Sequence, residues 1–171
     1  MTIAKRYGEL FQMSYITRDL DAAMAHAREA LGVETFSTTD AEVEVLSYGE
    51  VKPLKIRAAM ANIGRNQFEI IQPISGAIDI YTDEVDLDAH ILNFHHVAIA
   101  VRGDIDDWFA LLDEVRASGD EFAFLFPPQP TRDDKLCFAY VDTRKRLGHY
   151  TEYLWVDEAI TPIPAMPDLD A

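Results

Sequence analysis

Four residues that can bind a divalent metal recur along the chain at matched spacing: Gln12, Glu69, His96 and Glu152. Glu69 follows Gln12 by 57 residues, and Glu152 follows His96 by 56. A glutamate on an enclosed strand face is costly, and two such carboxylates repel each other, unless a cation compensates them. One imidazole, one amide oxygen and two carboxylates form a mixed set that suits Zn²⁺, Ni²⁺, Co²⁺, Mn²⁺ or Fe²⁺. We therefore expect one divalent metal ion, although Gln12 could instead hydrogen-bond a water molecule or a substrate.

The segment 94–101 predicts a strand with one packed face and one open face, because side chains alternate along a strand. The residues of the packed face are bulky and would lie under a helix: Val97, Ile99 and Val101. The open face carries an imidazole followed by small side chains: His96, Ala98 and Ala100. This pattern is typical of a cavity wall. A lone histidine on such a strand is often a hydrogen-bonded core residue, but the matched spacing of its partners favours a metal ligand.

The elements that would position these residues follow the same order twice. Residues 9–17 predict a strand, and Asp19 caps an apolar helical stripe that runs from Leu20 to Leu31 and ends at Gly32. Strands are then expected at 33–37, 42–48, 56–63 and 67–74. In the second half we expect a strand at 94–101, a helix capped by Asp104 or Asp106 that ends near Gly119, and strands at 121–126, 135–141 and 150–155. Equivalent positions lie 83 to 85 residues apart, which indicates two copies of one strand–helix–strands unit.

Composition excludes several classes of protein. The chain has 171 residues, is 49% apolar and carries a formal charge of −15, so a basic surface for nucleic acid or an anionic membrane is not expected. Cys137 is the single cysteine and cannot form an intrachain disulfide. We find no secretory signal in the first residues, no run of about 18 apolar residues and no glycine-rich phosphate loop. We therefore expect a cytoplasmic protein without a nucleotide cofactor.

Four segments, residues 11–24, 67–72, 94–101 and 148–155, resemble the vicinal oxygen chelate superfamily, the glyoxalase, bleomycin resistance and dioxygenase fold. The resemblance covers about residues 9–156. It implies an α+β protein in which two βαβββ modules form an open, cupped mixed sheet with helices on the outer face. The modules would be 9–76 and 94–156, joined by a linker at 77–93 and followed by a Pro-rich tail at 157–171. It also implies one metal held by the first and last strand of each module, which places Gln12, Glu69, His96 and Glu152 at the site.

The resemblance implies a glyoxalase-like lyase or isomerase that transfers a proton on a small carbonyl compound through a metal-stabilised enolate. Glu152 is the first candidate for the catalytic base and Glu69 the second. Ser14 and Tyr150 share strand faces with Gln12 and Glu152, so they are candidates for substrate contact. Alternatives are an acyl-CoA epimerase, an extradiol dioxygenase, or a metal-free protein that binds drugs. We expect a small-molecule substrate and a homodimer.

Overall fold

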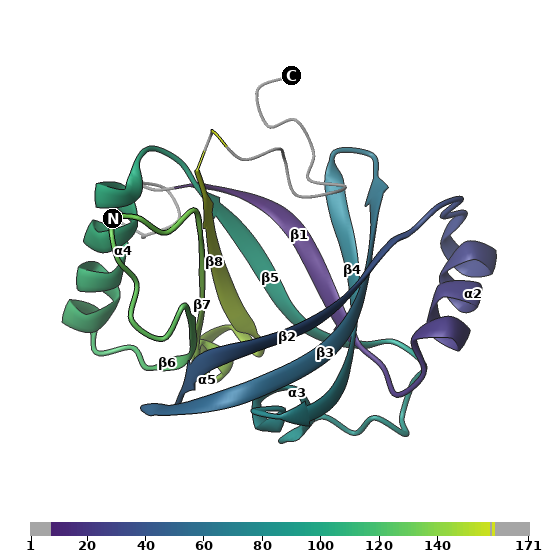
Figure 1. Ribbon diagram of the computed structural model, residues 1–171. Helices are drawn as coiled ribbons and strands as arrows, with labels where there is room; N and C mark the ends of the chain where they lie inside the picture. The colour runs from purple at the N-terminus through teal and green to yellow at the C-terminus, as the bar shows by residue number, and fades with distance from the viewer. Residues whose placement is uncertain (1–7, 158, 160–171) are drawn as a thin grey trace. The chain divides into compact units, whose positions relative to one another are not determined.

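The structure is a computed structural model that describes residues 8–157 and 159 (Figure 1). In chain order its elements are β1 (Gly8–Ile16), α2 (Leu20–Leu31), β2 (Ser37–Ser47), β3 (Glu50–Ile63), β4 (Asn66–Gly76), α3 (Asp79–Thr82), β5 (Asn93–Val101), α4 (Ile105–Ser118), β6 (Phe122–Phe126), β7 (Leu136–Val141), α5 (Arg144–Leu147) and β8 (Tyr150–Val156). The described residues form two compact units. Unit 1 contains residues 8–10, 44–52, 97–157 and 159, and unit 2 contains residues 11–43 and 53–96.

In unit 2 the strand order is β1-β4-β3-β2, and α2 covers one face of this sheet. β1 runs parallel to β4, whereas β3 and β4 are antiparallel. The apolar stripe of α2 packs on alternate residues of the strands: Ala59 of β3, and Phe68 and Ile70 of β4. The opposite face of the same strands must then carry the residues in between, because side chains alternate. These residues are mostly polar: Gln12, Ser14, Met60, Asn62, Gln67 and Glu69.

In unit 1 the strand order is β2-β6-β7-β8-β5, and α4 covers one face. Trp108, Leu111 and Val115 of α4 are fully buried against the strands. Ile99 and Val101 belong to this core, as their alternation in the sequence predicts. The opposite face of β6, β7 and β8 carries mainly aromatic side chains around one carboxyl group: Phe124, Phe126, Phe138, Tyr140, Tyr150 and Glu152.

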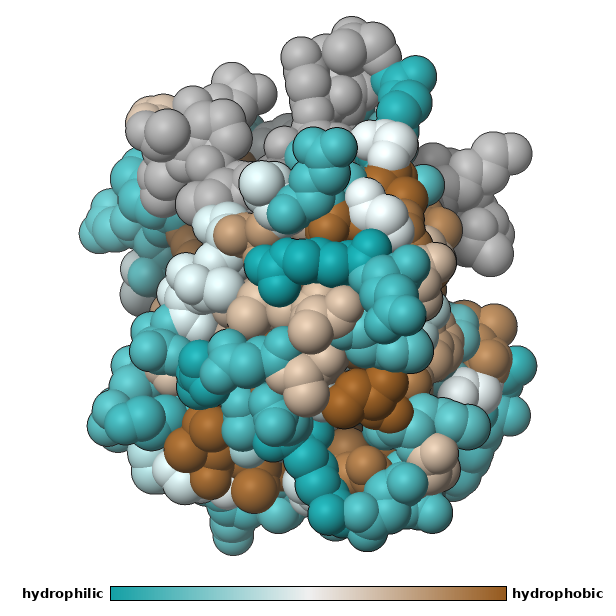
Figure 2. Space-filling model, turned by 90° about the vertical axis from the view of Figure 1, so that its right-hand side faces the viewer, coloured by the Kyte–Doolittle hydropathy of each residue, from teal (hydrophilic) through white to brown (hydrophobic). Residues whose placement is uncertain are grey.

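The two long helices begin and end at the residues that the sequence predicts. The Asp19 side chain accepts a hydrogen bond from the Ala22 backbone N–H, and Gly32 ends α2 in a left-handed conformation (φ 69°). Asp104 forms a capping box with Asp107 at the start of α4. In the view from the side of α2, hydrophilic residues cover most of the surface and hydrophobic ones form small separate groups (Figure 2). None of the helices in the described part of the chain is long and apolar enough to span a membrane.

Several predictions of detail are corrected. The expected strand at 33–37 is wrong, because residues 32–36 form an irregular segment after α2. The expected strand at 42–48 is part of a longer strand, β2, which begins at Ser37. Because β2 extends to Ser47, it reaches β6 and pairs Leu46 with Leu125. Each strand then has a hydrogen-bonded neighbour on both sides, so the prediction of an open sheet is wrong. The mixed sheet with helices is confirmed. The one-turn helix α5 was not predicted, because four residues show no apolar period.

The predicted linker at 77–93 contains the short helix α3. The predicted Pro-rich tail, 157–171, lies almost entirely outside the described residues. The division into modules at 9–76 and 94–156 stays a prediction, as does the homodimer.

Candidate functional site

Glu69 of β4 and His96 of β5 lie together in unit 2. The His96 Nε2 atom is 3.6 Å from the Glu69 Oε2 atom. The His96 side chain is fully buried, whereas the Glu69 side chain is 13% exposed. In the sheet, Glu69 pairs with Ser14 on one side and with Met60 on the other. The two residues are 27 positions apart in the sequence, and the fold brings this predicted pair together.

The tautomer of His96 follows from its neighbour. The His95 Nε2 atom lies 2.7 Å from the Ile80 backbone oxygen, which can only accept a hydrogen bond. A neutral imidazole carries one N–H, so His95 donates through Nε2 and its Nδ1 atom is an acceptor. The His96 Nδ1 atom, 2.9 Å away, must therefore donate to it. In the neutral form the lone pair of His96 is then on Nε2, the atom nearest Glu69.

This arrangement brings a nitrogen lone pair and a carboxylate oxygen together in a buried place. Two electron-rich atoms repel each other unless a proton or a metal cation lies between them. Metal-binding histidines commonly donate their second ring N–H to a carbonyl or another acceptor, which fixes the ring and the tautomer. His95 and the Ile80 carbonyl supply such a support for His96. The geometry therefore fits a protonated His96 or a bound cation.

The two predicted residues of β1 are buried on the same sheet face. Gln12 is 5% exposed and donates a short hydrogen bond from its Nε2 atom to Gln67. Its Oε1 atom and the Ser14 Oγ atom are buried and have no hydrogen-bond partner among the described residues. An unsatisfied buried acceptor costs about 1–3 kcal/mol. A metal ion, a water molecule or a polar substrate at these atoms would remove that cost.

Glu152 and Tyr150 lie in unit 1, on the aromatic face of β8. Glu152 is 8% exposed, and burial raises its carboxyl pKa from the ordinary 4.5 to about 8. Its partner across β7 and β8 is Tyr140. The Tyr150 hydroxyl lies 3.2 Å from the Tyr48 hydroxyl, and the Arg144 guanidinium lies 4.6 Å from the centre of the Tyr150 ring. Burial and the Tyr48 hydrogen bond raise the pKa of Tyr150.

Within the described residues, no three His, Cys, Asp or Glu side chains gather closely enough to hold a metal ion. The residues that do lie together are Glu69 and His96, with the amide oxygen of Gln12 on the same sheet face as Glu69. Imidazole nitrogen, carboxylate and amide oxygen are donors that divalent ions accept, and water completes such sites. Sequence reasoning missed Gln67, although it alternates with Phe68 and therefore shares the sheet face of Glu69. It also missed the contact between His95 and His96.

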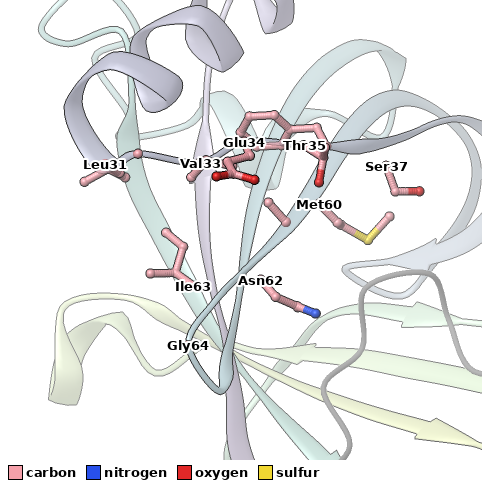
Figure 3. A pocket seen from close by; sticks show the side chains of 12 residues that line it. Leu31, Val33, Glu34, Thr35, Ser37, Met60, Asn62, Ile63 and Gly64 are labelled. Atoms are coloured by element: carbon pink, nitrogen blue, oxygen red, sulfur yellow. The ribbon is translucent and has the colours of Figure 1, made fainter.

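Unit 2 also contains a cavity of about 780 Å³ (Figure 3). One side is the segment from Leu31 to Ser37, after α2, and the other is the end of β3 with its turn, from Met60 to Gly64. Met60 pairs with Glu69 across β3 and β4, and Asn62 pairs with Gln67. The cavity therefore begins at the strand next to the Glu69 position.

Comparison with protein families identifies the fold. The family model described as Glyoxalase/Bleomycin resistance protein/Dioxygenase superfamily matches residues 11–138. The chain belongs to this superfamily. The predicted resemblance to the superfamily is thereby confirmed, and three of the four sequence segments, 11–24, 67–72 and 94–101, lie within the match. The match includes Gln12, Glu69 and His96 and ends before β8.

Solved structures of the superfamily fold resemble the chain at low sequence identity. A Streptomyces coelicolor methylmalonyl-CoA epimerase, in complex with 2-nitronate-propionyl-CoA, is 19% identical with a TM-score of 0.59, covering 91% of this chain and 99% of the other. The methylmalonyl-CoA epimerase of Mycobacterium tuberculosis is 18% identical with a TM-score of 0.56, covering 87% of both chains. A hypothetical protein from Bacillus halodurans is 16% identical with a TM-score of 0.53, covering 91% of this chain and 99% of the other. The comparison with curated proteins found no significant match.

Proposed function

We propose that this glyoxalase-superfamily protein is a divalent-metal-dependent enzyme that moves a proton next to a carbonyl group of a small molecule. The observation that carries the proposal is the approach of His96 Nε2 to the Glu69 carboxylate, 3.6 Å apart on a polar, mostly buried sheet face. His96, Glu69 and the Gln12 amide oxygen are the residues of unit 2 that would hold the ion. Glu152 is the fourth ligand that the family resemblance implies, and its membership stays a prediction. A bound ion would supply Lewis acidity to the carbonyl oxygen of the substrate.

The protein groups supply the proton transfer. Proton removal next to a carbonyl needs a carboxylate or another base within hydrogen-bond reach of the C–H group. Glu69 keeps part of its side chain exposed, so a substrate can reach it, and Ser14 is its neighbour in the sheet. Ser14 would donate its hydroxyl hydrogen to a substrate oxygen. Glu152, whose pKa of about 8 keeps its carboxyl group mostly protonated at neutral pH in the metal-free protein, remains the other candidate for an acid or base role.

The reaction class is that of an isomerase or a lyase. Removing a proton beside a carbonyl and returning it inverts a stereocentre or moves the carbonyl group. The structural neighbours include methylmalonyl-CoA epimerases, whose reaction is of this type. Their fold supports an isomerase, and glyoxalase-like lyase chemistry shares the same proton-transfer step.

The test has a binding part and a catalytic part. Metal content is measured for the wild type and for the double variant Glu69→Ala, His96→Ala, and we expect about one divalent ion per chain that the variant loses. The metal-loaded protein is then mixed in D₂O with hydroxyketones, hemithioacetals and 2-acyl thioesters, and exchange of the proton beside the carbonyl is followed by NMR. Glu69→Gln should abolish exchange. Glu29→Gln, an exposed carboxylate on α2, is the matched control and should retain it.

Two results would overturn the proposal. One is a wild-type protein that takes up no divalent ion when Zn²⁺, Ni²⁺, Mn²⁺ or Fe²⁺ is added. The other is exchange that survives in Glu69→Gln at the wild-type rate.

A second candidate function rests on the aromatic face of unit 1. The rings of Phe126 and Phe138 stack with centroids 4.9 Å apart, and Phe138 stacks on Phe124 at 5.8 Å. A row of parallel rings favours a planar apolar ligand. A metal-free protein that only binds such a ligand would change its Trp fluorescence on binding and would leave the ligand chemically unchanged.

A further inference from the structure

Gln12 and Gln67 form an amide pair on the sheet face that carries the candidate metal ligands. They are direct partners in β1 and β4, and the Gln12 Nε2 atom donates a hydrogen bond to the Gln67 Oε1 atom. Ser14 and Glu69 are the next partners along these two strands whose side chains lie on the same face. Gln67 is therefore a neighbour of the proposed site and contacts one of its predicted ligands.

Both side chains are buried, and each keeps one polar group without a partner. Gln67 is 2% exposed, and Gln12 is buried beside it. Within the part of the chain that the structure describes, the Gln12 Oε1 acceptor and the Gln67 Nε2 donor have no hydrogen-bond partner. Buried polar groups in folded proteins are nearly always hydrogen-bonded. Two unpaired groups on adjacent side chains indicate that a polar ligand, an ion or water binds at this face.

Gln72, on the same strand as Gln67, shows the opposite behaviour. Its Nε2 atom donates to the Arg18 backbone oxygen at 2.8 Å, and its Oε1 atom accepts from the Leu20 backbone N–H at 3.3 Å. A glutamine that ties elements of the fold together thus uses both ends of its amide group on protein groups. The Gln12–Gln67 pair uses one end of each amide and leaves the other end for something else.

The amide chemistry decides which end of Gln12 can meet a cation. Only the amide oxygen can bind an ion, because the NH₂ group is a donor of hydrogen bonds. When the oxygen is turned toward an ion, the NH₂ group is turned away from it and needs an acceptor at this buried position. The Gln67 Oε1 atom is that acceptor, and it already accepts from Gln12 in the structure. Metal ligands are commonly oriented by such supporting hydrogen bonds.

We propose that Gln67 is a positioning residue, whose side-chain oxygen accepts the Gln12 N–H group and thereby holds the Gln12 amide oxygen toward the divalent ion. The inference rests on the proposed function for the ion. It assigns a role to a residue outside the predicted ligand set. The Gln67 Nε2 group then donates to a water molecule or a substrate oxygen at the same face.

The first measurement is the Zn²⁺ affinity of the full chain, by calorimetric titration. Gln67→Met keeps the length of the side chain and removes both polar atoms. We expect it to weaken Zn²⁺ binding by about 10- to 100-fold, the usual effect of losing a hydrogen bond that supports a ligand. Asn62→Met is the matched control, because Asn62 is exposed and lies opposite Gln67 on β3. It should leave the affinity within about twofold of the wild type.

A double-mutant cycle shows whether Gln67 acts through Gln12. Gln12→Met should itself weaken Zn²⁺ binding, because it removes the amide oxygen. In that background there is no amide group left to orient, so Gln67→Met should change the affinity by less than about twofold. A residue that merely supports the sheet would weaken binding equally in both backgrounds.

Two further measurements keep the test independent of damage to the fold. Gln67→Glu retains an oxygen that accepts the Gln12 N–H group, so it should bind Zn²⁺ at least as tightly as the wild type. In metal-free ¹⁵N-labelled protein, the Gln12 NH₂ signals are identified by their loss in Gln12→Met. The hydrogen-bonded proton of this group should lie downfield in the wild type and move upfield in Gln67→Met.

The outcomes separate this inference from the proposed function. If Gln67→Met binds Zn²⁺ within about twofold of the wild type, or loses the same affinity in both backgrounds, the inference is overturned and the proposed function stands. The same holds if Gln12→Met leaves the affinity unchanged. If the wild type takes up no divalent ion, both fail. If the cycle behaves as expected but no proton exchange occurs in D₂O, Gln67 positions the ligand and the proposed reaction is wrong.

Discussion

The Nδ1 atom of His95 lies 2.9 Å from the Nδ1 atom of His96, and the other ring nitrogen of His95 lies 2.7 Å from the Ile80 carbonyl oxygen. These contacts define the direction of each hydrogen bond. The carbonyl fixes the tautomer of His95, which in turn fixes the tautomer of His96 and leaves the lone pair on Nε2. The Tyr81 ring packs against His95, with centroids 5.2 Å apart, and holds it in place. A backbone carbonyl on α3 thus determines which atom of a candidate metal ligand is basic.

Replacing His95 by phenylalanine should weaken metal binding without removing a ligand. Phenylalanine keeps the contact with Tyr81 but removes both ring nitrogens, so the His96 Nδ1–H group loses its acceptor. Loss of such a supporting hydrogen bond lowers metal affinity by about 10- to 100-fold. Calorimetric titration with Zn²⁺ measures the affinity, and the ¹⁵N shifts of His96 report its tautomer. His26→Phe, at an exposed position of α2, is the control. Unchanged affinity in His95→Phe would show that the tautomer of His96 does not depend on His95.

Glu152 should make the metal-free protein less stable at alkaline pH. Burial raises its pKa from 4.5 to about 8, so the folded state holds its proton more tightly than the unfolded state does. The stability that this proton contributes is complete below pH 4.5 and is lost as pH rises through 8. Glu152→Gln removes the titration. The variant should have nearly the wild-type stability at pH 4 and should be more stable than the wild type at pH 9 by up to about 5 kcal/mol.

Urea unfolding of both proteins at several pH values measures this difference, and the other titrating groups cancel in the comparison. A difference between the two proteins that does not grow between pH 5 and pH 9 would rule out the raised pKa. If Glu152 is also the catalytic base, the same variant should bind metal but lose the exchange reaction in D₂O.

Local sequence signals predicted the parts of the fold that depend on neighbouring residues. Asp19 and Gly32 cap the two ends of α2, and Asp104 and Gly119 cap the two ends of α4. The sequence predicts them because a cap acts within a few residues. The alternation on β5 likewise separated His96 from the residues under α4. These features require only the period of a strand or a helix and the geometry of its ends.

Features that depend on distant partners were not predicted. Leu46 of β2 pairs with Leu125 of β6, so β2 is not an edge strand. No residue near Leu46 in the sequence predicts this pairing. The tautomer of His96 depends on the backbone carbonyl of Ile80, which lies in the predicted linker at 77–93. The sequence predicts a strand at 33–37, yet residues 32–36 are irregular and line a cavity. The four candidate ligands were found through their spacing, and the structure places two of them, Glu69 and His96, in contact distance.

Cys137 should resist alkylation in the folded protein. Its side chain is fully buried in the α4 core, and burial raises the thiol pKa to about 12. The thiolate is the reactive form, and a pKa three units above the ordinary value reduces its population by about 1000-fold. Iodoacetamide should therefore modify less than one part in about 100 of the protein in the time that fully labels it in urea, as judged by mass spectrometry. Rapid modification under native conditions would show that the core around α4 opens frequently.

Gly76, at the end of β4, should tolerate no side chain. Its backbone is in the left-handed region (φ 85°), and a Cβ atom would lie 2.0 Å from the Pro53 carbonyl oxygen, which accepts a hydrogen bond from the Ala77 N–H. Gly76→Ala should therefore cost the strain of a positive φ, about 1–3 kcal/mol, plus the displacement of that strand. Gly64, in the turn between β3 and β4, is the matched control, because its φ is 64° and a Cβ atom there meets nothing within 4 Å. Gly64→Ala should cost only about 1 kcal/mol. Urea unfolding measures the free energy of unfolding of both variants, provided that their m-values are equal. Equal losses of stability would show that the Pro53 carbonyl moves away from the new Cβ atom without cost.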